Sequence, residues 1–292
     1  MTRSAVAVVT DSTAYLPEGF AERSSVRVVP LHVLVEEDGG LDGVDFGPVE
    51  LAAALAEHRP VTTSRPTPAE LANAYREALT GADAVVSVHL SRDLSGTWEA
   101  ARLAAEEVGA DRVRVVDSRS TAMGLGFAVL AAAQAAAAGA GAAEVERIVT
   151  DTASRTRTLF CLQTIEYLRR GGRVGPAAAL LGTALAVKPL LHVSGGKIVP
   201  LEKVRTTSRA VTRLVELAVE VAGEGPVGLA VHHLGAPERA AELANRLEER
   251  LPKAAGCLVS EVGAAVGAHT GVGVLGVVVL PGGLADTDPV ES

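Results

Sequence analysis

The feature that most constrains this chain is a repeated alternation of short β-branched runs with longer helical patterns. Ala5–Val9 is the first such run, and it leads into the polar residues Thr10–Thr13, as expected where a buried parallel strand reaches its carboxyl end. Further strands are predicted at Val26–Val35, Ala84–Leu90 and Val113–Asp117. This alternation predicts an α/β fold with a doubly wound parallel sheet, whose ligands bind beyond the carboxyl ends of the strands.

Helical patterns separate these strands. Thr67 is the predicted N-cap of the helix Pro68–Leu79. The helix that begins at Met123 is rich in alanine and is predicted to be buried. The predicted helices are Pro48–Glu57, Pro68–Leu79, Trp98–Val108 and a stretch from Met123 to near Gly139.

The composition shifts after about Gly141, where a second α/β unit is predicted. Two strands, His192–Ser194 and Lys197–Val204, flank Gly195-Gly196 and predict a hairpin, which makes the second sheet mixed. We therefore expect an N-terminal α/β domain over residues 1–150, a C-terminal α/β domain with a mixed sheet over 151–283, and a frayed acidic tail over 284–292. The other elements predicted here are strands Thr158–Leu162, Val227–His232 and Leu258–Val262, and helices Glu144–Ser154, Pro176–Leu185, Thr206–Ala222 and Pro237–Leu251.

Composition excludes several classes of protein. The 292 residues are 48% hydrophobic, enough for a large core, while a net charge of −8 and 3% aromatic residues argue against a nucleic-acid-binding protein. The longest apolar run, Met123–Ala143, is interrupted by Gln134 and four glycines, so we expect no transmembrane segment. Cys161 and Cys257 form no CxxC motif and no signal peptide is apparent, so we expect a cytoplasmic protein without a metal or cofactor.

One candidate binding stretch is Val262–Gly276, where His269 and Thr270 are set among glycine, alanine and valine. Small neighbours let backbone or ligand approach closely, so this pair suits a clamp for a small polar head group. A core histidine beside a capping threonine would fit the same residues. The GxGxxG pattern within the stretch precedes a strand and a stop, the reverse of a dinucleotide site, and we reject a nucleotide-binding role.

Two other loops carry hydroxyl groups. Thr63 and Ser64 lie in a hydroxyl-rich segment before Arg65 and Pro66, which suits either a turn or a binding loop. Ser95 lies between a strand and a helix, where it would serve as a simple N-cap or help to bind an anion.

Several phrases, taken in order along the chain, resemble the DegV family over nearly the whole sequence. They are TDST (Thr10–Thr13), TSRP (Thr63–Pro66), LSGT (Leu94–Thr97), DSRSTAMGLG (Asp117–Gly126), LRRGGRVG (Leu168–Gly175), KPLL (Lys188–Leu191), GKIVPLEKVRT (Gly196–Thr206) and AHTGVGVLG (Ala268–Gly276). The resemblance implies a two-domain architecture that holds a long-chain fatty acid, such as palmitate or oleate, in a tunnel between the domains. Some members are the binding subunit of a bacterial fatty acid kinase and present the carboxylate to a separate ATP-using protein.

The resemblance also implies which residues bind the carboxylate. Arg65 stands where the family commonly has glutamine; facing the pocket it would add a charge at the head group, and facing solvent it would not. The implied carboxylate contacts are Thr63, Ser64, Ser95, His269 and Thr270.

Other functions fit the same residues. A serine-dependent acyl hydrolase or transferase would use Ser95 as nucleophile, His269 as base and Asp117 or Asp11 as the orienting acid. We prefer the carrier because no GxSxG nucleophile elbow occurs. A structural α/β protein with an empty groove is the third alternative.

Basic residues gather in two places on this acidic chain. Such clusters are typical of a docking face for an acidic partner, here a fatty acid kinase, although two solvated basic loops would give the same pattern. The clusters are Arg169, Arg170 and Arg173, and Lys203, Arg205 and Arg209.

Overall fold

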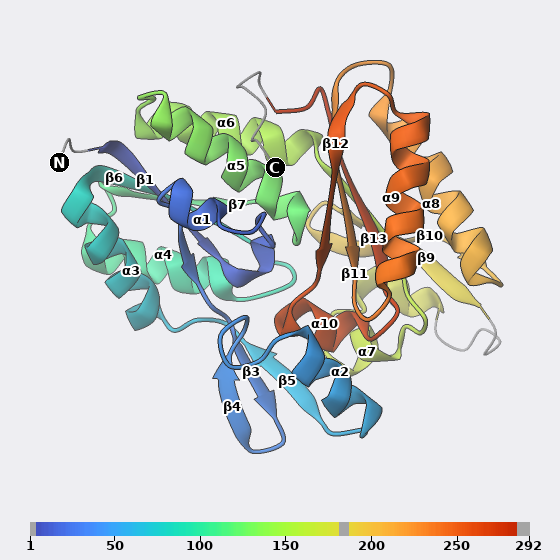
Figure 1. Ribbon diagram of the computed structural model, residues 1–292. Helices are drawn as coiled ribbons and strands as arrows, with labels where there is room; N and C mark the ends of the chain where they lie inside the picture. The colour runs from blue at the N-terminus through green and yellow to red at the C-terminus, as the bar shows by residue number, and fades with distance from the viewer. Residues whose placement is uncertain (1–3, 181–186, 285–292) are drawn as a thin grey trace.

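The computed structural model describes residues 4–180 and 187–284 of the chain. The strands of this part form three sheets: a four-stranded sheet, a six-stranded sheet and a small three-stranded sheet (Figure 1). The predicted α/β class is confirmed.

The four-stranded sheet is parallel throughout and has helices on both faces. Successive residues point to opposite sides, so Val8 packs in one core while Val9 packs in another. Helices α3 and α4 cover the face of Val9, and α5 and α6 cover the face of Val8, as predicted for a doubly wound sheet. In spatial order the strands are β2 (Arg27–Val29), β1 (Ser4–Asp11), β6 (Ala82–His89) and β7 (Val113–Asp117). The helices are α3 (Pro68–Gly81), α4 (Thr97–Val108), α5 (Met123–Ala137) and α6 (Ala142–Arg155).

Helix α5 lies between the two larger sheets. Its first eleven residues, Met123–Ala133, are all buried, and its core includes Val278 and Leu280 of the second sheet. A helix with an apolar surface all round must be covered on every side, so its alanine-rich sequence suits a position between the two sheets.

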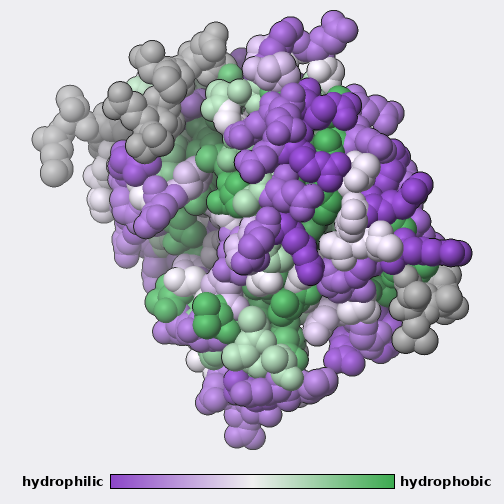
Figure 2. Space-filling view, turned by 45° about the vertical axis from the view of Figure 1, so that its right-hand side comes forward, coloured by the Kyte–Doolittle hydropathy of each residue, from purple (hydrophilic) through white to green (hydrophobic). Residues whose placement is uncertain are grey.

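The six-stranded sheet is mixed, as predicted. Only β11 and β12 pair in parallel among its described strands, and the other neighbours are antiparallel. Helices α8 and α9 cover one face, and the outer surface over them is predominantly hydrophilic (Figure 2). In spatial order the strands are β10 (Lys197–Val204), β9 (Lys188–Ser194), β8 (Arg157–Cys161), β13 (Leu275–Pro281), β11 (Val227–His233) and β12 (Ala254–Glu261). The helices are α8 (Thr207–Ala222) and α9 (Pro237–Arg250).

The small antiparallel sheet corrects the prediction of a single strand over Val26–Val35. Pro30 interrupts that run because it has no N–H to donate to a ladder, so β2 joins the parallel sheet and β3 starts a new one. The segment Thr62–Ser64, weighed as a turn, belongs to strand β5 of this sheet and pairs with β3. Its elements are β4 (Asp38–Leu41), β3 (His32–Val35), β5 (Val61–Ser64) and the adjoining helix α2 (Pro48–Ala56).

Short helices were also missed. α10 (Ala264–Thr270) occupies the glycine- and alanine-rich stretch that carries His269, and α7 (Glu166–Arg170) precedes the glycine-rich turn. Of the predicted helix Pro176–Leu185, residues Gly175–Leu180 form a 3₁₀ helix, η2, and the remainder lies outside the described residues, as does the acidic tail beyond residue 284. The remaining short elements are η1 (Ser12–Ala14) and α1 (Phe20–Arg23).

The division at residue 150 remains a prediction, although α6 ends at Arg155 and β8, the first strand of the second sheet, begins at Arg157. In the described part of the chain, no helix combines the length and apolar character needed to span a bilayer.

Candidate functional site

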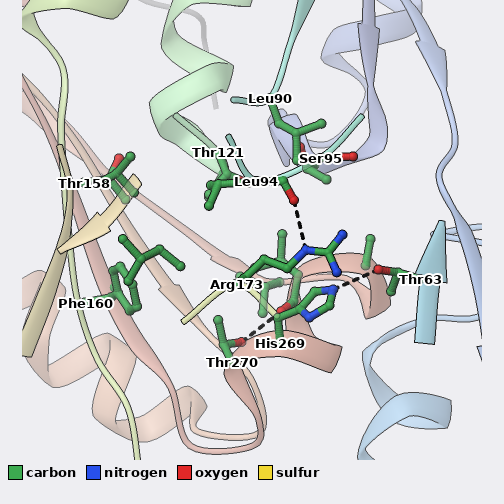
Figure 3. Close-up of a pocket in the computed structure, with 18 of the residues that line it drawn as sticks. Thr63, Leu90, Leu94, Ser95, Thr121, Thr158, Phe160, Arg173, His269 and Thr270 are labelled. Carbon is green, nitrogen blue, oxygen red and sulfur yellow. Dashed lines mark hydrogen bonds between the residues drawn. The ribbon is translucent and has the colours of Figure 1, made fainter. Parts of the chain in front are cut away.

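A pocket lies where the carboxyl edge of the parallel sheet meets the mixed sheet and α10 (Figure 3). Its empty space, counting the open mouth, is about 950 Å³. Most of its lining is apolar: Leu31, Leu90, Leu94, Ala122, Phe160, Leu168, Val193, Ile198, Val262, Ala265, Val266, Val274 and Val278.

One end of the pocket carries a hydrogen bond between two predicted site residues. Thr63 Oγ1 lies 2.8 Å from His269 Nε2, although 206 residues separate them in sequence. Thr63 comes from β5 and His269 from the last turn of α10. The hydrogen bond therefore joins the small sheet to α10 at the pocket wall.

His269 is held in its neutral form. Burial, and secondarily the charge of Arg173, lowers its pKa to about 4, so the ring carries no charge near pH 7. Its Nδ1 is buried and has no hydrogen-bond partner among the described residues. A buried N–H without an acceptor is unfavourable, so the favoured tautomer carries its proton on Nε2 and donates it to Thr63 Oγ1. The Thr63 hydroxyl is then free to donate into the pocket.

The His269 ring packs directly against the Cα atom of Gly171. A Cβ built on Gly171 would lie 2.1 Å from His269 Nδ1, closer than real atoms approach. The backbone of Gly171 is ordinary helical, with φ −73°. The glycine is therefore required for space and not for conformation.

Arg173, predicted as a docking residue, lines the pocket instead of standing free on the surface. Its Nε donates to the Leu94 carbonyl at 3.0 Å (Figure 3). Its Nη1 donates to the Gly171 carbonyl. Arg173 thus joins the turn after α7 to the loop before α4, and it places a positive charge beside His269.

Ser95 also lines the pocket, from the loop between β6 and α4. It is not the N-cap of α4, which is Gly96. Its Oγ accepts a hydrogen bond from the Thr97 N–H at 3.3 Å and lies 2.9 Å from Thr97 Oγ1. This short motif fixes the serine hydroxyl at the pocket wall.

The other predicted contacts also line the pocket. Thr270 lines the pocket, but its hydroxyl donates to the Val266 carbonyl at 3.2 Å within α10. Ser64 and Arg65 are exposed, and Arg65 lies across Gly96, where an added Cβ would be 2.3 Å from Nη1. Both line the pocket and a shallower groove that continues from it toward the surface.

The remaining basic residues lie elsewhere. Arg170 is exposed and pairs with Glu166 at 3.1 Å; Arg169 pairs with the same carboxylate, and together they lower the pKa of Glu166 to about 2. Lys203, Arg205 and Arg209 are exposed around the end of β10 and the start of α8 and do not line the pocket.

The structure does not assemble the hydrolase triad. His269 bonds Thr63 instead of Ser95, and Asp117 Oδ1 accepts from the Arg119 N–H at 2.8 Å. Asp11 bonds His89 at 3.0 Å, and His89 in turn lies 2.7 Å from Ser87 Oγ. Ser87, His89 and Asp11 are thus connected in the same order as a Ser–His–Asp catalytic triad. All three side chains are, however, completely buried, and Ser87 Oγ also accepts a hydrogen bond from the Tyr75 hydroxyl. It is a structural network without access for a substrate.

Sequence reasoning missed several polar residues of the pocket. Thr13, Thr121 and Thr158 line it, and so does His232. Thr13 and Thr121 belong to two of the motifs shared with the DegV family, but those motifs alone do not indicate a role for them. No motif or pattern in the sequence indicates that His232 lies in a pocket. Over residues 4–180 and 187–284, no group of three His, Cys, Asp or Glu side chains is arranged to hold a metal ion.

Known proteins resemble the chain over nearly its whole length. The profile described as "Uncharacterised protein, DegV family" matches residues 5–282. A DegV domain-containing protein of Streptomyces coelicolor is 54% identical over 275 residues, covering 94% of this chain and 98% of the relative. The protein DegV of Bacillus subtilis is 35% identical, covering 93% and 98%.

Solved structures agree with the fold. A fatty-acid-binding DegV family protein from Thermus thermophilus superposes with a TM-score of 0.91 at 33% identity, covering 95% of this chain and 99% of that one. DegV from Bacillus subtilis, described as a fatty acid binding protein, superposes with a TM-score of 0.86 at 33% identity, covering 94% and 99%. On the evidence of the profile, the relatives and the shared fold, this chain belongs to the DegV family.

Proposed function

We propose that this protein binds a long-chain fatty acid, with the acyl chain in the apolar part of the pocket and the carboxylate beside Thr63 and His269. The observation that carries this proposal is the Thr63–His269 hydrogen bond at one end of a pocket whose lining is mostly apolar. The structural neighbours from Thermus thermophilus and Bacillus subtilis, described as fatty acid binding, support it.

The two ends of the pocket contribute differently to affinity. Burying ~14 methylenes of a C16 chain at ~0.8 kcal/mol each gives an upper bound of roughly 11 kcal/mol before the ordering terms. A hydrogen bond to a charged group adds about 1.5–3 kcal/mol. The tail therefore supplies most of the affinity. The hydroxyls of Thr63 and Ser95, with the positive charge of Arg173, orient the carboxylate.

We assign the protein a carrier role without chemistry of its own. The candidate nucleophile Ser95 is hydrogen-bonded to Thr97 and has no histidine partner among the described residues.

The cysteines Cys161 and Cys257 are both free thiols, which suits the reducing cytoplasm.

Presentation of the bound carboxylate to a separate fatty acid kinase is the finer form of this proposal. Lys203, Arg205 and Arg209 are exposed and suit an acidic partner surface. Charge reversal at Lys203 and Arg205 is expected to slow acyl-phosphate formation by the kinase at low salt and to leave fatty-acid affinity unchanged. Unaltered phosphorylation kinetics at low salt would remove both residues from the partner surface.

Lipid extraction of the freshly purified protein, followed by mass spectrometry, tests the binding function. We expect roughly stoichiometric fatty acid, in the range of about C14 to C18 for a pocket of this size. Protein that is empty when isolated and takes up neither palmitate nor oleate would contradict the proposal.

A further inference from the structure

Helix α10, which carries His269, is too short to hold its own position. It has seven residues, contains Gly267, and has no capping side chain at its N-cap, Gly263. Helices shorter than about 12 residues are marginal in isolation. The placement of His269 therefore depends on the contacts that anchor α10.

Asp42 supplies the missing cap from a distant part of the chain. Its Oδ1 accepts a hydrogen bond from the Ala265 N–H at 3.0 Å, although 223 residues separate the two in sequence. A carboxylate at this position satisfies free N–H groups and the positive end of the helix dipole. A Cβ built on Gly263 would lie 2.8 Å from Asp42 Oδ1, so Asp42 occupies the space that an N-cap side chain would need.

The same carboxylate is fixed on its other side. Asp42 Oδ2 accepts from Ser12 Oγ at 2.7 Å, and Ser12 Oγ accepts from the Leu31 N–H at 3.1 Å. The Asp42 N–H donates to the Leu31 carbonyl at 2.8 Å. Asp42 is only 3% exposed, and a carboxylate so buried is tolerated only because all these bonds are made.

Two contacts therefore hold α10 against the small sheet. Asp42 follows β4 and binds the first turn of α10, while Thr63 on β5 binds His269 in its last turn. Strand β3 lies between β4 and β5 and pairs with both, so the same small sheet connects the two anchors. We propose that Asp42 is a positioning residue for the head-group site, which holds α10 so that His269 meets Thr63. This inference rests on the proposed fatty-acid binding.

The test compares two ligands on four forms of the full-length protein. The forms are wild type, Asp42→Ala, Asp42→Asn and the matched control Asp45→Ala, whose carboxylate is exposed and accepts the Leu41 N–H at 2.8 Å without reaching α10. The ligands are palmitate and hexadecanol, which share the tail and differ in the head group. We expect Asp42→Ala to weaken palmitate binding by about ten- to a hundredfold and hexadecanol binding by less than about threefold. Asp42→Asn keeps an acceptor for Ala265 and is expected to lie between wild type and Asp42→Ala, while Asp45→Ala changes neither affinity.

Each other outcome has a distinct meaning. Equal weakening of palmitate and hexadecanol would overturn the positioning role and leave Asp42 as a purely structural residue. Unchanged palmitate affinity in either Asp42 variant would also overturn it, and the Asn variant decides the question if the Ala variant does not fold. Failure of wild type to bind either ligand would refute the proposed function itself.

Discussion

Two histidines line the pocket, and they have nearly the same pKa but different hydrogen-bonding states. Burial lowers the pKa of both His232 and His269 to about 4. His232 uses both ring nitrogens within the protein: Nδ1 lies 2.9 Å from Ser260 Oγ, and Nε2 accepts the Met123 N–H at 3.0 Å. Among the described residues, His269 has a hydrogen bond only with Thr63. Burial and a low pKa therefore do not distinguish the two histidines, whereas their hydrogen-bond partners among the described residues do.

The largest expected effect follows from removing the structural member of the pair. His232→Ala leaves the Met123 N–H, at the start of the buried helix α5, without a partner and opens a cavity. We expect the free energy of unfolding to fall by about 3 kcal/mol, measured by urea denaturation. His192→Ala, at a half-buried strand position, is the control and should change stability by less than about 1 kcal/mol. An equal loss of unfolding free energy in His232→Ala and His192→Ala would contradict a special structural role for His232.

His269→Ala should affect binding more than folding. The variant loses the group that orients Thr63, so fatty-acid affinity is expected to fall about ten- to a hundredfold. The unfolding free energy of the empty protein should fall less than in His232→Ala, because one ring nitrogen of His269 has no hydrogen-bond partner in the described part of the chain. Titration with palmitate and urea denaturation test both parts. A His269 variant that binds normally but unfolds easily would show the histidine to be structural.

Gly171→Ala tests whether the position of the His269 ring matters. The added methyl group would overlap Nδ1 and displace the ring from its present position, so we expect about a tenfold loss of fatty-acid affinity. Gly141→Ala is the control: Gly141 has a similar φ of −74° in an extended backbone, and no atom lies within 4 Å of the added group. It should bind as wild type does. Equal affinity in the two variants would mean that the site tolerates a displaced imidazole.

A last expected effect is on the pH dependence of stability. A histidine with a folded pKa of about 4 and an unfolded pKa of about 6.5 binds fewer protons when folded. Its contribution to stability is therefore complete above about pH 6.5 and decreases as the pH falls toward 4. Denaturation at about pH 7.5 and about pH 4.5 should show this decrease in wild type and a shallower one in both histidine variants. Parallel profiles for wild type and variants would contradict the lowered pKa values.

Local patterns predicted most of the regular structure. Thr67 caps α3 and Glu70 completes its capping box, as expected from a threonine and proline ahead of a helical pattern. The Gly195-Gly196 hairpin and the strand Val113–Asp117 were also predicted correctly. These elements depend on residues close together in sequence. The strands of the small sheet were missed because they are short and gain their pairing from β3 after the break at Pro30.

The sequence by itself determined the fold class, the family resemblance and the hydroxyl and imidazole groups that line one end of the pocket. Only the tertiary structure decided how those groups are used. In the folded protein the stretch around Gly267 is a helix, Asp42 caps that helix, and Arg173 lies at the pocket wall. Each of these outcomes depends on atoms contributed by residues far apart in the chain, and hydrophobic periodicity and turn chemistry report only on neighbours in sequence. The hydrogen-bond partners of His232 and His269 could not be predicted from the sequence for the same reason.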